Sequence, residues 1–120
     1  MRRILLIRHG ESEHHIRGMT GGWTDLPLTG TGHEQAERTA QRLVELVGGE
    51  SVSIFSSDLA RAVMTAEPVG RALGIPIERV PGLREHNNGS AAGLTKAAAS
   101  KLQLPQAGNP SDWQPYPGAE

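Results

Sequence analysis

The feature that most constrains the fold is a run of four aliphatic residues, Ile4 to Ile7, that ends directly at Arg8-His9-Gly10. Apolar side chains at consecutive positions predict a strand that is covered on both faces, as in a parallel sheet. In such sheets, ligands bind outside the carboxyl ends of the strands. The run therefore predicts an α/β protein with a candidate site directly after its first strand.

A helix is predicted after a long polar loop over residues 10–30. Thr31 and Glu34 fit a capping box, with Thr31 as the N-cap residue. Apolar residues then recur at helical spacing up to the glycines 48 and 49; they are Ala36, Ala40, Leu43, Val44 and Val47.

The chain continues with a strand, a helix and a strand. Short strands are expected over Val52 to Phe55 and over 75–80, the latter at a sheet edge because Pro76 lies near its start. The helix between them extends from Leu59 to Leu73, and Pro68 should kink it or split it near Glu67. The order βαβαβ predicts a parallel sheet, and the whole chain, 1–120, is interpreted as a single domain.

The last third of the chain differs in composition from the rest. Residues 85–120 contain no Ile, Val, Phe or Met, and their large aliphatic residues are Leu94, Leu102 and Leu104. A weak helix is predicted from about Leu94 to Leu102, and residues 105–120 hold four prolines without a periodic pattern. This stretch has little apolar surface to bury.

Composition excludes several classes of protein. The chain has 120 residues and no cysteine, so a disulfide scaffold, a thiolate zinc site and a cysteine nucleophile are excluded. The formal net charge is −1, which gives no argument for nucleic acid or an anionic membrane as a partner. Its apolar runs are far shorter than the ~18 residues of a spanning helix, and the start of the chain does not fit a signal peptide. A cytoplasmic protein is therefore predicted.

Four residues near the expected strand ends could form one electropositive site. They are Arg8 and His9 after the first strand, Arg61 after the second and Glu85 after the third. A nucleophile or base, two guanidinium groups and a carboxyl group suit phosphoryl transfer. Taken alone, each also has a structural interpretation, as a turn histidine, a surface arginine or a solvated glutamate.

The five histidines do not predict a metal site. His14 and His15 are adjacent and should point apart, and no H-x-x-x-H spacing occurs. No metal or organic cofactor is predicted.

The chain resembles the histidine phosphatase superfamily, also called phosphoglycerate mutase-like, in four blocks that follow the family's order. They are Leu6-Ile7-Arg8-His9-Gly10-Glu11-Ser12; Gly22-Trp23-Thr24-Asp25-Leu26-Pro27-Leu28-Thr29 with Gly32 and Gln35-Ala36; Ser56-Ser57-Asp58-Leu59-Ala60-Arg61-Ala62 with Thr65-Ala66; and Leu83-Arg84-Glu85 with Gly89 and Gly93-Leu94-Thr95. The resemblance implies a three-layer α/β/α fold with a mostly parallel sheet, and a metal-independent phosphatase.

The resemblance also implies roles for individual residues. His9 is the expected nucleophile, which forms a phosphohistidine, and Glu85 the acid that protonates the leaving oxygen. Arg8 and Arg61 are expected to hold the phosphoryl oxygens. A segment that comprises Thr20, Gly21 and Gly22 is expected on the substrate side.

The chain departs from the family pattern at three places. His15 stands where the family usually has Asn, and His14 replaces a common Trp; His15 could donate a hydrogen bond to phosphate or have a surface role. The acid loop lacks the usual Trp-Glu before Gly93. The family's second catalytic histidine, in a His-Gly pair, has no counterpart, so the domain is expected to be incomplete at its C-terminus, with an exposed sheet edge that could form a homodimer.

These observations favour a phosphomonoester hydrolase that acts on a small phosphorylated metabolite. A phosphoglycerate mutase is the less favoured enzyme, because the long insertion of the cofactor-dependent mutases after the acid loop is not seen. Two other interpretations stay open: a catalytically impaired phosphate-binding or dimerising remnant, and a fragment of a longer enzyme.

Overall fold

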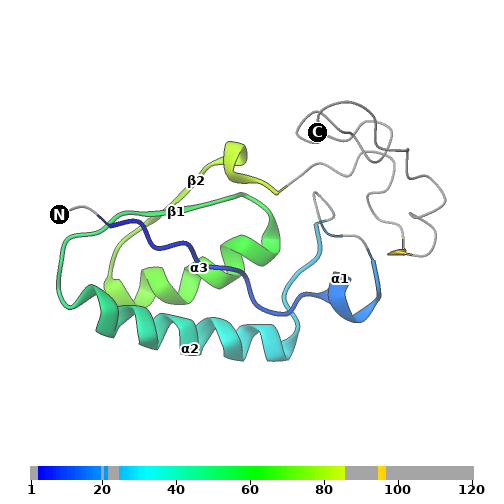
Figure 1. The fold of residues 1–120 in the computed structure, drawn as a ribbon, viewed down its shortest axis with the longest axis horizontal. Helices are drawn as coiled ribbons and strands as arrows, with labels where there is room; N and C mark the ends of the chain where they lie inside the picture. Colours follow the sequence, from blue (N-terminus) through cyan, green and yellow to red (C-terminus); the bar gives the residue numbers. More distant parts are fainter. Residues whose placement is uncertain (1–2, 20, 22–24, 86–94, 97–120) are drawn as a thin grey trace.

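A computed structural model describes residues 3–19, 21, 25–85 and 95–96. Its central unit is a parallel pair of strands, β1 (Ile54–Ser56) and β2 (Ile77–Arg79), joined by helix α3 (Ala60–Leu73) (Figure 1). Helix α2 (Gly30–Val47) precedes β1, and the short helix α1 (Glu13–Ile16) precedes α2. A 3₁₀ turn, η1 (Pro81–Leu83), follows β2 and leads to Glu85.

Helix α2 confirms the predicted helix, but its N-cap residue is Thr29 and not Thr31. The Thr29 hydroxyl accepts a hydrogen bond from the Gly32 backbone N–H over 3.0 Å, while Thr31 lies inside the first turn. The prediction was wrong because Thr29, two residues earlier, can also cap the helix although it lacks the glutamate of a capping box, and tertiary contacts select it. Thr29 also donates to the Glu11 carboxylate over 2.8 Å, which ties the helix start to the segment after His9.

Pro68 was expected to kink or split helix α3 near Glu67; the helix is continuous from Ala60 to Leu73, so the split is wrong. An interior proline removes one helical hydrogen bond. Burial on both sides of the proline, at Thr65 and Val69, holds the helix together across it. The helix ends as predicted at Gly74, which adopts a left-handed conformation with φ of 68°.

The core lies between the two long helices and the strands. Ala40 and Leu43 of α2 form a buried cluster with Val69 of α3, and Ile54 and Leu73 pack against it. The apolar positions predicted for α2 are buried except Val44, which is 41% exposed. The apolar face with which α2 packs on α3 therefore lacks one residue, Val44, that the pattern predicted.

The first predicted strand is not formed. Ile4 and Leu6 are 85% and 91% exposed, and residues 4–7 make no backbone hydrogen bond with other described residues. The segment runs past the helices and is attached at its ends, by Arg3 to the Leu46 carbonyl and by Gly10 to Thr65 (Figure 1). A continuous apolar run forms a strand only where a neighbouring strand is hydrogen-bonded to it, and no described strand pairs with this run.

The other two strands are confirmed with shifted limits. The first begins two residues later than predicted and includes Ser56, and Ile77–Arg79 is shorter than the predicted 75–80. Pro76 directly precedes β2, where it interrupts no ladder hydrogen bond. The predicted helix at Leu94 to Leu102 lies largely outside the described residues. No helix in the described part of the chain is long and apolar enough to cross a membrane.

Candidate active site

The rings of His9, His14 and His15 lie close together at helix α1. The ring centroids of His14 and His15 lie 4.0 Å apart, and that of His9 lies 6.0 Å from His14 and 5.6 Å from His15. The prediction that His14 and His15 point apart is therefore wrong. The site contains an imidazole, that of His14, to which the sequence analysis gave no role.

Local hydrogen bonds explain why the two adjacent rings face the same way. Both turn back toward Ser12, the fully buried N-cap residue of α1. The Ser12 backbone N–H donates to His15 Nδ1 over 3.1 Å, and the Ser12 hydroxyl is hydrogen-bonded to His14 Nδ1. Histidine can take the place of the usual Glu or Gln in a capping box because its Nδ1 is an acceptor.

The hydrogen bonds also determine the neutral tautomers of His9 and His15. His9 Nδ1 lies 2.7 Å from the Gly10 carbonyl, which can only accept, so Nδ1 carries the proton and Nε2 keeps its lone pair. His15 Nδ1 accepts from an N–H, so its proton lies on Nε2. The site thus holds a nucleophilic nitrogen beside a hydrogen-bond donor.

Arg61 supplies a buried positive charge beside these rings. Its side chain is 2% exposed, and Nη2 donates to Glu85 Oε2 over 3.0 Å, a carboxylate that is 59% exposed. Thr65, one turn further along α3, donates to the Arg61 carbonyl over 2.8 Å and accepts from the Gly10 N–H over 3.3 Å. One buried threonine thus connects the residue after His9 to the turn that carries Arg61.

Burial and positive charge lower the pKa of two of the imidazoles, those of His9 and His14. Desolvation lowers the pKa of His9 below its usual value, the Gly10 hydrogen bond opposes this, and the charge of Arg61 lowers it further. Desolvation also lowers the pKa of His14 to about 4, with the charge of Arg61 acting in the same direction. At neutral pH, His9 is therefore in the form that can attack an electrophile.

Of the four residues expected to converge, the structure brings together His9, Arg61 and Glu85, and His15 lies beside them. Arg8 is exposed and makes no ion pair with the described residues. Gly21 lies at the site: a Cβ atom there would be 3.1 Å from His14 Nε2 and 3.9 Å from Glu85 Oε2. Thr20 and Gly22 lie outside the described residues.

The start of α3 is occupied by a carboxylate of the protein itself. The Ala60 N–H donates to Asp25 Oδ1 over 2.7 Å. The start of a helix favours an anion, and Asp25 supplies one. A phosphoryl group at this site would therefore be held by side chains more than by the first N–H of α3.

A second ion pair next to Glu85 was missed by the sequence analysis. Arg84 Nε and Nη2 donate to the two carboxylate oxygens of Asp58, each over 2.5 Å. This hydrogen bonding lowers the pKa of Asp58 and raises that of Arg84. The sequence contained a signal for this ion pair, since Asp58 lies in the same family block as Arg61, and Arg84 lies in the same block as Glu85.

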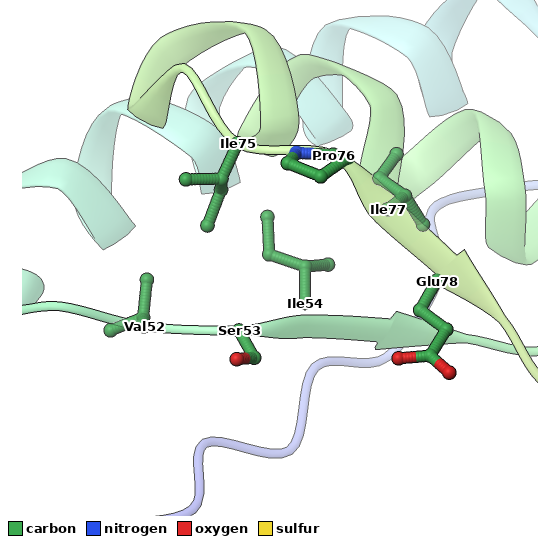
Figure 2. Close-up of a pocket in the computed structure, with 7 residues that line it drawn as sticks. All are labelled: Val52, Ser53, Ile54, Ile75, Pro76, Ile77 and Glu78. Atoms are coloured by element: carbon green, nitrogen blue, oxygen red, sulfur yellow. The ribbon is translucent and has the colours of Figure 1, made fainter.

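A separate cavity of about 390 Å³ lies at the N-terminal ends of β1 and β2 (Figure 2). Its lining includes Ile54 and Ile75, which point toward each other, and Pro76 and Ile77, and it contains no basic residue. It therefore lacks the charge to hold a phosphate. No group of three or more His, Asp or Glu within the described ranges is arranged to hold a metal ion.

The chain matches known sequences over most of its length. Residues 4–120 match the sequence profile described as histidine phosphatase superfamily (branch 1). The chain is 42% identical over 90 residues to the probable phosphoglycerate mutase GpmB of Photorhabdus laumondii, a match that covers 74% of this chain and 40% of that protein. It is 36% identical over 104 residues to the 2,3-bisphosphoglycerate-dependent phosphoglycerate mutase of Porphyromonas gingivalis, covering 84% of this chain and 42% of that one.

Solved structures show the same fold. Bacillus stearothermophilus YhfR superposes with a TM-score of 0.70 at 35% identity, over 79% of this chain and 46% of that one. A mycobacterial glucosyl-3-phosphoglycerate phosphatase in complex with VO3 gives 0.68 at 32% identity, over 74% and 41%. The chain thus spans about two fifths of the length of the curated relatives described above.

Proposed function

This chain belongs to the histidine phosphatase superfamily, and we propose that its site hydrolyses phosphomonoesters of small metabolites through a phosphohistidine on His9. The predicted family and its phosphoglycerate mutase-like α/β fold are thereby confirmed. The observation that carries the proposal is the hydrogen bond from His9 Nδ1 to the Gly10 carbonyl, which leaves the Nε2 lone pair available beside a buried guanidinium.

The proposed reaction has two steps. In the first, His9 Nε2 attacks phosphorus, the P–O ester bond breaks, and the leaving oxygen takes a proton from the Glu85 carboxyl group. In the second, Glu85 takes a proton from water, whose oxygen attacks phosphorus. The P–N bond then breaks, which releases inorganic phosphate and restores the lone pair on His9.

Three cationic or donor groups would stabilise the transferring phosphoryl group. Arg61 is fixed and buried, so its charge acts at low dielectric. Arg8 directly precedes His9 in the sequence, is exposed, and makes no ion pair in the described part of the chain, so its guanidinium can turn toward the substrate. His15, through Nε2–H, would donate a hydrogen bond beside them. The proposal includes Arg8 and His15 as phosphate ligands. It also places Thr20, Gly21 and Gly22 on the substrate side.

The test is trapping of the covalent intermediate with an aryl phosphate and the full chain. A phosphohistidine that is stable to alkali and labile to acid should form on wild type, and His9→Ala should abolish both it and turnover. His33→Ala is the matched control, because His33 is an exposed histidine of α2 whose ring is not one of the three that meet at the site. Turnover unchanged in His9→Ala, without a phosphorylated intermediate, would refute the proposal.

A mutase is the second candidate function, favoured by the names of the two curated relatives. The two reactions share the phosphohistidine and differ in what accepts the phosphoryl group. Incubating the trapped intermediate with 3-phosphoglycerate distinguishes them: a phosphatase releases inorganic phosphate, whereas a mutase transfers the group to the acceptor. Vanadate binding without turnover would instead indicate a phosphate-binding module, and light scattering would test the predicted homodimer.

A further inference from the structure

Two ion pairs of opposite polarity join the same two segments of the chain. Arg61 pairs with Glu85 over 3.0 Å, and Asp58, three residues before Arg61, pairs with Arg84 over 2.5 Å. One segment leads into α3 and carries the buried guanidinium; the other follows η1 and carries the carboxyl group proposed as the acid.

The first of these pairs cannot persist through the proposed reaction. To protonate the leaving oxygen, Glu85 must carry a proton, and a neutral carboxyl group no longer attracts a guanidinium as an anion does. The phosphoryl oxygens also compete for Arg61. At the moment of proton transfer, this link between the segments is therefore weakened.

The second pair has no such conflict. Arg84 binds Asp58 through two parallel hydrogen bonds, the geometry that gives an arginine–carboxylate pair its rigidity. Both side chains are more than two thirds buried. Apolar anchoring of the turn before them is weak, since Pro81, Gly82 and Leu83 are exposed.

We propose that Asp58 and Arg84 are positioning residues that hold Glu85 at the phosphoryl site while Arg61 is engaged by substrate. This inference rests on the proposed function for its catalytic consequence. The residues act through Glu85 and do not themselves touch the phosphoryl group.

The first experiment uses two substrates that differ in their need for an acid. An alkyl phosphate needs a proton on its leaving oxygen, whereas a nitrophenyl phosphate leaves readily without one. Because misplacing a catalytic group by an ångström costs about 10²-fold, Arg84→Gln and Asp58→Asn should lower kcat by about 10- to 100-fold on the alkyl ester and less than about threefold on the aryl ester. The double variant Asp58→Arg with Arg84→Asp should recover part of the loss.

The control is Arg71→Gln, which removes an exposed ion pair of 3.0 Å to Glu37 that joins α3 to α2 away from the site. It should change neither substrate. Equal losses on both esters in Arg84→Gln, or no loss on either, would overturn the positioning role.

A second measurement does not depend on turnover. The amides of Leu83 and Arg84 donate to the carbonyls of Val80 and Pro81, and their hydrogen exchange reports opening of the turn. Glu85→Ala removes the Arg61 link, as substrate is proposed to do. Exchange should rise modestly in Arg84→Gln and in Glu85→Ala, and by about tenfold or more in the double variant. If the exchange in the double variant rises only by the sum of the two single effects, the inference is overturned. If exchange follows the expected pattern but no phosphohistidine forms, only the proposed function is overturned.

Discussion

The imidazoles of His9 and His15 stack at 19° with centroids 5.6 Å apart, and the backbone holds them as opposite neutral tautomers. A carbonyl fixes the proton of His9 on Nδ1, and an N–H fixes that of His15 on Nε2. A nucleophile and a hydrogen-bond donor are therefore presented side by side by two copies of the same side chain. The proposed role of His15 as a phosphate ligand depends on this difference.

Removing the donor of His15 should weaken the reaction without abolishing it. A hydrogen bond to a charged group contributes about 1.5–3 kcal/mol, so His15→Ala should lower kcat/KM by about 10- to 100-fold. His15→Asn keeps an N–H donor and should recover most of the activity. Steady-state kinetics on one aryl phosphate measures both, and equal activity of all three proteins would assign His15 a surface role.

The acid limb of the pH–rate profile should report His9. Only neutral His9 attacks, and its pKa is lowered, so kcat/KM should fall as the pH drops below 6.5. Arg61 lowers this pKa and Glu85 raises it, so Arg61→Gln should shift the limb to higher pH and Glu85→Gln to lower pH. Titration of the His9 ring by NMR gives the same test in variants too slow to assay. Shifts in the same direction would contradict the electrostatic arrangement.

Burial of His14 should make the fold less stable in mild acid. Its pKa is about 4 in the folded chain against 6.5 when unfolded, so between these values the unfolded state binds a proton that the native state does not. The free energy of unfolding should therefore fall as the pH drops from 6.5 toward 4, by up to about 1 kcal/mol per pH unit from this residue.

Denaturant unfolding at several pH values measures that slope. His14→Gln should flatten it, while His33→Gln, at an exposed position of α2, should keep the slope of wild type. A slope that is unchanged in His14→Gln would show that other groups determine the acid sensitivity.

The helices could be predicted from the sequence because their signals are local. Apolar spacing and a terminal glycine define α2 and α3 within one turn, and Gly48 and Gly74 end them in left-handed conformations. The segment at Ile4 to Ile7 could not, because a strand is defined by its partners. The same reasoning explains the N-cap: Thr29 was selected over Thr31 by a carboxylate, Glu11, that is distant in sequence.

The site could be predicted only as far as the family blocks reached. They identified His9, Arg61 and Glu85, which the structure brings together. They did not predict that His14 shares the site, since that follows from the way Ser12 orients two successive rings. Nor could charge alone show whether Arg84 contacts solvent or Asp58, because that depends on how η1 approaches α3.

A close backbone contact at Gly32 predicts that the site cannot lose this glycine. A Cβ atom on Gly32, in the first turn of α2, would overlap the Glu11 carbonyl oxygen. The Gly32→Ala variant must therefore displace the segment that carries Gly10 and His9, or the start of the helix. We expect it to lower the free energy of unfolding by about 1–3 kcal/mol and to reduce phosphohistidine formation more than stability alone explains, because His9 moves with that segment.

Gly30→Ala is the matched control: a Cβ atom there meets nothing within 4 Å, and alanine favours the helix, so stability should hold or rise slightly. Denaturant unfolding with intermediate trapping on both variants decides the matter, and equal behaviour of the two would show that the contact between residues 11 and 32 does not position His9.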